Sequence, residues 1–220
     1  MRPTRAQFQE DLEMLRVDVG ALGVMAEEAV VGSLRALLGD DRGAAHDVVA
    51  GDDRLDAFFV ALEERAYGLV ARQAPVAADL RVLMSSLRVI SDFEKTGDRA
   101  VTVAKAALAD WPREPHTLGI LGRMGDLALE LLHAARRAWV DQDLLLASEL
   151  KHRDDVLDGT YRQLVAHLLT QQGPCAPSLV LHAHAAGRNL ERVADHAVIV
   201  GERVGYMLTG DPGALAAEVG

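Results

Sequence analysis

Two segments of the sequence each place two carboxylates one helical turn apart. "SDFEKTGDRA" (91–100) and "NLERVADHAV" (189–198) both contain a Glu, three further residues and an Asp, and both have Ala two places after that Asp. Residues four apart are neighbours on one face of a helix. Glu94 with Asp98, and Glu191 with Asp195, are therefore predicted to form carboxylate pairs. Such pairs can share a proton, pair with arginine or bind a hard cation.

A second acidic motif precedes each of these segments. "DDRLD" (52–56) and "DDVLD" (154–158) again place acids four apart, as Asp52 with Asp56 and Asp154 with Asp158. Asp52 and Asp154 stand in seven-residue rows that are otherwise apolar or aromatic, and so does Glu94. The apolar residues in the Glu94 row are Leu80, Leu87, Val101 and Leu108. We therefore expect the acids to lie on the apolar side of their helices or at its edge.

Four acids in each half of the chain would repel one another near an apolar seam, where each ionised carboxylate also costs several kcal/mol to desolvate. Protonation, pairing with nearby Arg or Lys, or a bound cation could each offset that cost. Clustered carboxylates suit oxygen-preferring ions such as Fe³⁺, Mn²⁺ or Mg²⁺, with Zn²⁺ a further candidate. The predicted metal ligands are Asp52, Asp56, Glu94 and Asp98, then Asp154, Asp158, Glu191 and Asp195.

The elements that must position these acids are helices. Clusters of turn residues cut the chain into long pieces, and apolar residues recur within each piece at steps of three and four. No segment shows a convincing strand alternation. We expect an all-α fold with helices over about 5–38, 43–71, 76–109, 117–140, 143–170 and 178–209. Gly210, followed by Pro212, is predicted to end the last helix.

The two halves of the chain repeat each other. "LGVMAE" (22–27) matches "LGRMGD" (121–126), and the two pairs of acidic motifs follow in the same order at similar spacing. The Pro-rich "DWPREPH" lies between the halves. We therefore predict two tandem three-helix bundles, over residues 1–111 and 112–220.

Composition limits the classes of partner. The chain has 220 residues, 50% of them hydrophobic and 25% charged, which is enough to bury a core. A formal net charge of −10 argues against nucleic acid and anionic lipid as partners. No apolar stretch approaches the ~20 residues that cross a bilayer, and no signal peptide is apparent. With a single cysteine, Cys175, the sequence indicates a cytoplasmic protein without membrane insertion.

The stretch "RQAPVAADLRVLMSSLRVISDFEKTGDRA" (72–100), together with "DDRLD" and "RNLERVADHA", resembles the PhoU family of phosphate-transport regulators. The likeness covers essentially the whole chain. Its most specific part is the run QxPxAxDLR before the Glu-xxx-Asp motif, formed here by Gln73, Pro75, Ala77, Asp79, Leu80 and Arg81.

The resemblance implies a fold and a set of partners. By this resemblance, the two three-helix bundles would be related by a pseudo-twofold axis. The acids on two helices of each bundle would hold metal clusters. All eight family positions are acidic here. The function implied is regulatory and not enzymatic: a negative regulator of phosphate uptake and starvation signalling. It would link the ATPase subunit of a phosphate ABC transporter to a membrane histidine kinase, commonly as a homodimer.

Several alternatives remain open at this point. The second half lacks the Asp-Leu-Arg that follows the proline in the first, so the two sites are expected to differ in their surroundings. A carboxylate-bridged di-metal oxidase or a metal-storage bundle would also use acids on helices, although such oxidases carry Glu-x-x-His motifs. A structural dimer with arginine-paired acids, and a regulator beside another phosphate permease, are further possibilities.

Overall fold

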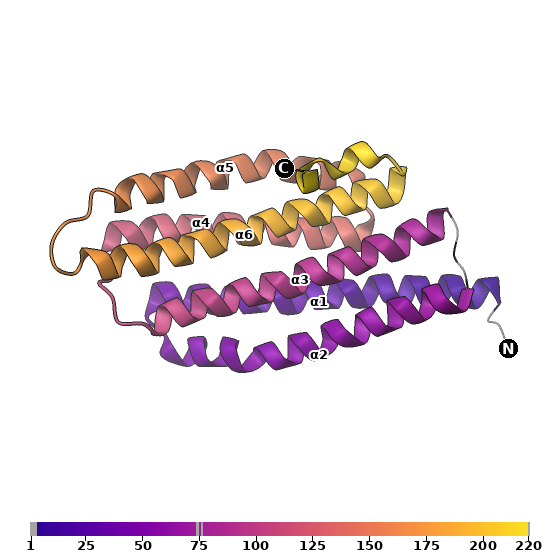
Figure 1. The fold of residues 1–220 in the computed structure, drawn as a ribbon, viewed down its shortest axis with the longest axis horizontal. Helices are drawn as coiled ribbons and strands as arrows, with labels where there is room; N and C mark the ends of the chain where they lie inside the picture. Colours follow the sequence, from indigo (N-terminus) through magenta and orange to yellow (C-terminus); the bar gives the residue numbers. More distant parts are fainter. Residues whose placement is uncertain (1–3, 74, 76, 220) are drawn as a thin grey trace.

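The computed structural model describes residues 4–73, 75 and 77–219, and six long helices dominate this part of the chain (Figure 1). They are α1 (Arg5–Gly39), α2 (Arg42–Gln73), α3 (Ala78–Leu108), α4 (Pro115–Asp141), α5 (Leu144–Leu168) and α6 (Ala176–Thr209). A short 3₁₀ segment, η1 (Pro212–Val219), packs against α6. The described residues include no strand, which confirms the all-α prediction.

The helices form two three-helix bundles, α1–α3 and α4–α6, that lie side by side along the long axis of the molecule (Figure 1). Among the residues that the structure describes, α2 contacts α1 and α3 alone, and α5 contacts α4 and α6 alone. Across the two halves, α3 contacts α6 and α1 contacts α4. Each interface between the halves thus joins corresponding helices, as an internal duplication with pseudo-twofold symmetry requires. The boundary expected after residue 111 lies in the connection between α3 and α4.

Helix ends follow the residues that can cap them. Gly210 adopts φ +73° and ends α6 where the sequence places the stop. α4 begins two residues before the expected start near 117. Pro115 occupies the first turn of α4, where a missing N–H is harmless, and the Glu114 carboxylate accepts hydrogen bonds from the backbone N–H groups of His116 and Thr117.

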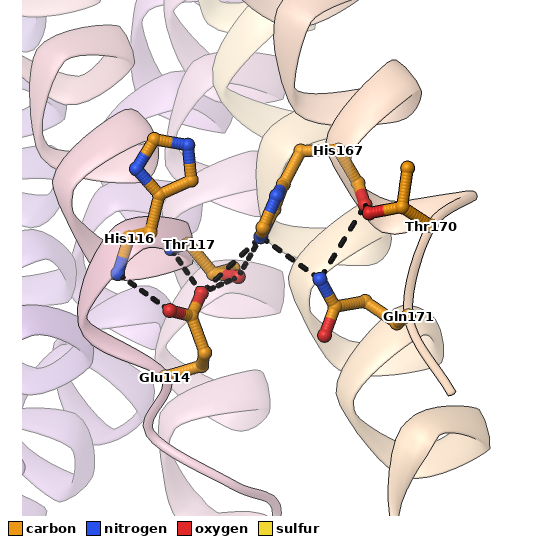
Figure 2. A network of polar contacts seen from close by, with 6 residues as sticks. All are labelled: Glu114, His116, Thr117, His167, Thr170 and Gln171. Atoms are coloured by element: carbon orange, nitrogen blue, oxygen red, sulfur yellow. Dashed lines mark hydrogen bonds and ion pairs between the residues drawn. The ribbon is translucent and has the colours of Figure 1, made fainter. Parts of the chain in front are cut away.

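The same Glu114 carboxylate joins the start of α4 to the end of α5 (Figure 2). Its Oε2 lies 3.2 Å from His167 Nε2, and the Thr117 hydroxyl lies 3.1 Å from that nitrogen. Partial burial alone would raise the pKa of Glu114, but the hydrogen bonds from Thr117, His116 and His167 lower it to about 2. The carboxylate therefore stays ionised at neutral pH, as a cap that also holds two helices together.

Candidate metal centres

The first acidic cluster lies at a close contact between α2 and α3. Leu55, between the two acids of α2, packs on Gly97, between the two acids of α3. A Cβ at residue 97 would lie 2.8 Å from Leu55 Cδ1, which is closer than side-chain carbons pack. The glycine in "EKTGD" thus permits the approach that brings four acids near one another: Asp52, Asp56, Glu94 and Asp98.

Mutual repulsion among these acids shows in their pKa values. Burial raises the pKa of Glu94, and the neighbouring charges of Asp98 and Asp56 raise it further. The pKa of Asp52 is raised by burial, then by Asp56 and by Asp98 on the facing helix. The acids of α2 and α3 are therefore close enough to interact electrostatically. The structure thus brings together the four side chains that the sequence grouped.

The second cluster, between α5 and α6, is more deeply buried than the first. Asp154 is 3% exposed, and burial together with the charges of Asp158 and Asp195 raises its pKa to about 6. Glu191 is also buried, and its Oε1 pairs with the Arg188 guanidinium. Burial and Asp195 raise the pKa of Glu191, and partial desolvation and Asp158 raise that of Asp195.

Two carboxylate oxygens of this second cluster are buried and have no hydrogen-bond partner within the described part of the chain. They are Asp154 Oδ1 and Glu191 Oε2. An unsatisfied buried acceptor costs about 1–3 kcal/mol and more when charged. A proton or a cation would satisfy them, and the raised pKa values show that the protein environment favours added positive charge here.

The eight acids differ in how deeply they are buried. Asp154 and Glu191 are buried; Asp52, Glu94 and Asp158 are half-buried; and Asp56, Asp98 and Asp195 are exposed. Each cluster therefore runs from the helix seam outward to solvent. The expectation that the acids lie at the apolar side of their helices or at its edge holds for the first acid of each motif. The second acid, four residues further along the helix, is rotated by about 40° around the helix axis and therefore lies closer to the surface.

The donor types fit a hard cation, while the side-chain positions do not yet form a coordination sphere. Across residues 4–73, 75 and 77–219, no group of three or more His, Cys, Asp and Glu side chains is arranged so that it could hold a metal ion. Loading a cation would require the carboxylates to turn toward one another. The metal assignment of the eight acids therefore stays a prediction.

A buried polar cluster that the sequence did not reveal lies between the two halves. Asp92 of α3 is fully buried; its Oδ1 lies 3.1 Å from His196 Nδ1 of α6, and its Oδ2 lies 3.3 Å from Arg88 Nε. Arg88 thus contributes to this cluster through Asp92, and His196 joins the two halves through the same carboxylate. Two buried serines of α3, Ser85 and Ser86, lie seven and six residues before Asp92, and they were a weak hint in the sequence of polar groups there.

Comparison with known proteins gives a consistent family. A model of the PhoU domain matches residues 19–107 and 121–204, once in each half. The phosphate-specific transport system accessory protein PhoU homolog 1 of Mycobacterium tuberculosis is 32% identical over 209 residues, covering 94% of this chain and 95% of that protein. The homologue of Caulobacter vibrioides is 32% identical over 212 residues, with 94% and 92% covered.

Solved structures agree with the sequence relatives. PhoU from Pseudomonas aeruginosa superposes with a TM-score of 0.86 at 30% identity, covering 93% of this chain and all of that one (100%). The phosphate transport system regulatory protein PhoU from Streptococcus pneumoniae superposes with a TM-score of 0.84 at 26% identity, with 93% and 98% covered. Among the described residues, no helix has the length and apolar character needed to span a bilayer. With the domain matched in both halves and relatives aligned along nearly its full length, this chain belongs to the PhoU family.

Proposed function

We propose that this protein is an accessory regulator of phosphate transport. The observation that carries the proposal is the match in both repeats, and along nearly the whole chain, to proteins named for the phosphate-specific transport system. In finer detail, it acts as a negative regulator of phosphate uptake and of phosphate-starvation signalling. It does so by binding the ATPase subunit of a phosphate ABC transporter and a membrane histidine kinase, and it works as a homodimer in the cytoplasm, where those partners use ATP.

Metal binding at the two acid clusters is the second part of the proposal. Five of the eight acids have a raised pKa, and two buried oxygens lack partners in the described chain. A bound Fe³⁺, Mn²⁺, Mg²⁺ or Zn²⁺ would supply positive charge that cancels the repulsion between facing helices. Asp52 and Asp56 would then be tied to Glu94 and Asp98, and the acids of α5 to those of α6.

The role proposed is regulatory and not catalytic. A carboxylate-bridged di-metal oxidase would carry histidine three residues after its Glu. That position is Gly97 in one motif and Ala194 in the other. We expect no peroxide- or oxygen-dependent turnover from the metal-loaded protein. A metal-storage bundle would take up many ions per chain, whereas two acid clusters would saturate at a few.

The metal proposal is tested on protein purified without chelator, by elemental analysis and by titration with Fe³⁺ and Mn²⁺. Glu94→Ala with Asp98→Ala should remove binding in the first half and leave the second half loaded. The matched control is Asp53→Asn, an exposed acid next to Asp52. If the wild-type chain binds neither ion, the acids are neutralised in another way. Loss of metal from both halves would instead mean that the clusters are coupled.

The regulatory proposal is tested by deleting the gene and measuring phosphate-starvation transcripts in phosphate-rich medium. Deletion should raise those transcripts, and a plasmid copy of the gene should restore repression. Unchanged transcripts in the deletion strain would refute the negative role. Pull-down with the purified transporter ATPase and with the kinase cytoplasmic region would separate the two proposed partners.

A further inference from the structure

A row of apolar side chains lies exposed along α1. Val17, Val24, Val31 and Leu38 follow one another at intervals of seven residues, and they are 53%, 38%, 53% and 39% exposed. Single exposed apolar residues are ordinary on protein surfaces, but apolar residues that repeat along one face of a helix indicate an interaction site. The row extends over 21 residue steps, or about 31 Å at the rise of an α-helix.

The second repeat provides an internal comparison for this row. When "LGVMAE" is aligned with "LGRMGD", the corresponding positions of α4 carry His116, Arg123, Glu130 and Arg137. These four residues are also exposed. The fold therefore accepts charged or polar side chains at these positions, and folding alone does not explain why α1 carries apolar residues there.

The apolar row borders a groove between α1 and α2. The groove has a volume of ≈ 580 Å³, and Val24 and Val31 line it together with Val48 and Leu55 of α2. Val48 and Leu55 are nearly buried, so they form an apolar floor, while the exposed valines form one wall. A floor of this kind can receive the apolar side chains of a docked segment.

Charge decides what can occupy the groove. Arg136 neutralises Glu27, and Arg35 pairs with Asp41 at 3.1 Å. The remaining charged residues of the groove lining are three acids and one arginine, namely Glu28, Asp47, Asp52 and Arg54. The lining therefore has an excess of negative charge. An acidic lining repels a second copy of the same surface, which would present the same acids, and it repels an anionic membrane.

We propose that the α1–α2 groove binds an amphipathic helix of a partner protein, with apolar residues on one face and Lys or Arg beside them. The length of the row matches about 20 helical residues, longer than a small ligand, and helix-in-groove docking uses apolar anchors at such spacing. The inference rests on the proposed function and deepens it by stating which segment chemistry a partner presents. Asp52 belongs to both the groove and the first acid cluster.

The test uses fluorescently labelled synthetic peptides and the purified full-length chain. One 18-residue peptide has Leu along one helical face and Lys on the other, a second has Glu in place of each Lys, and a third has the Leu/Lys composition scrambled. Fluorescence anisotropy should show saturable binding of the Leu/Lys helix that weakens as salt is raised. The Leu/Glu and scrambled peptides should bind at least tenfold more weakly.

A double variant, Val24→Arg with Val31→Glu, tests whether the peptide binds in the α1–α2 groove. It replaces two α1 residues by those found at the corresponding positions of α4. It should weaken binding of the Leu/Lys helix at least tenfold while the circular dichroism spectrum and melting temperature stay near wild type, because the same residue types are tolerated in α4. The control is Leu181→Glu on α6, where the native side chain is 65% exposed and is not part of the groove lining. It should bind like wild type.

Three results would overturn the proposal. They are equal binding by the double variant, equal binding of the scrambled peptide, and self-association through the groove, seen as a dimer that Val24→Arg with Val31→Glu dissociates. The regulatory role is judged separately in the deletion strain. Absent peptide binding with raised transcripts on deletion would remove only the groove assignment, whereas peptide binding with unchanged transcripts would remove only the regulatory role.

Discussion

At the scale of single residues, Asp154 has an unusual environment for a carboxylate. It is almost completely buried, has an unpartnered oxygen and lies beside two further carboxylates. Its pKa of about 6 compares with an ordinary value of 3.8, so between about pH 4 and pH 6 the folded protein holds a proton that the unfolded chain releases. Without metal, the stabilising effect of that proton is complete below about pH 4 and is lost as the pH rises through about 6.

We expect Asp154→Asn to stabilise the chelated protein at pH 8, because it removes the cost of ionising a buried carboxylate. That cost is on the order of 3 kcal/mol at most, from 1.36 kcal/mol per pKa unit. Thermal melts in EDTA should show that the melting temperature of the wild-type protein falls from pH 5 to pH 8. The melting temperature of the variant should fall less over the same pH range. Asp155→Asn, at an exposed neighbour, should behave as wild type. Equal pH dependence in Asp154→Asn and wild type would contradict the assignment.

At the scale of helices, small residues set the distance between the pairs that carry the acids. Gly97 packs on Leu55 where α3 crosses α2. In the second half, "ERVAD" has Ala194 at the corresponding place, and it is fully buried, as is Leu157 of α5. The spacing of the acid clusters is therefore a property of helix packing as much as of the acids themselves.

Gly97→Val should push α2 and α3 apart and destabilise the protein by about 1–3 kcal/mol, the usual cost of overpacking. It should also weaken metal binding in the first cluster and leave the second unchanged. Urea unfolding and metal titration measure the two effects. Gly119→Val in α4, where no atom lies within 4 Å of an added Cβ, is the control and should keep near wild-type stability. A variant with normal stability and normal metal binding would show that the close approach is dispensable.

At the scale of the whole molecule, the two bundles are joined by polar as well as apolar contacts. Asp92 lies in the middle of the α3–α6 interface and pairs with one cation of its own helix and with a histidine of the other half. Trp139 of α4 is fully buried and donates from Nε1 to the Arg16 carbonyl of α1 at 3.0 Å. These contacts hold the halves in one orientation, which fixes both acid clusters relative to the groove on α1.

Asp92→Ala should destabilise the protein by about 3 kcal/mol, because it leaves Arg88 and His196 facing a cavity in place of a carboxylate. Asp92→Asn should cost less, since an amide fills the space and can still hydrogen-bond. Urea denaturation followed by circular dichroism measures both variants, with Asp110→Ala at an exposed position as control. A loss below about 0.5 kcal/mol for Asp92→Ala would mean that apolar packing alone joins the halves.

The sequence by itself determined the helices, the duplication and the grouping of the acids. Helical periodicity is local, so six helices could be predicted within a few residues of their ends, and Gly210 could be identified as a stop. The starts of α3, α4 and α6 each differ by two residues from the expected positions. The cap of α4 could not be predicted, because Glu114 is not among the usual N-cap residues and its carboxylate also contacts His167 of another helix.

Only the tertiary structure decided how deeply each acid is buried and which contacts join the two halves. Asp154 and Asp52 occupy the same position of the repeated motif, yet Asp154 is buried and Asp52 is half-buried, because burial depends on the neighbouring helices and not on the residue's own spacing. Asp92 and His196 lie about a hundred residues apart, and no local pattern pairs them. A sequence specifies which face of a helix is apolar, but the contacts between faces set desolvation, and desolvation sets the electrostatics of this protein.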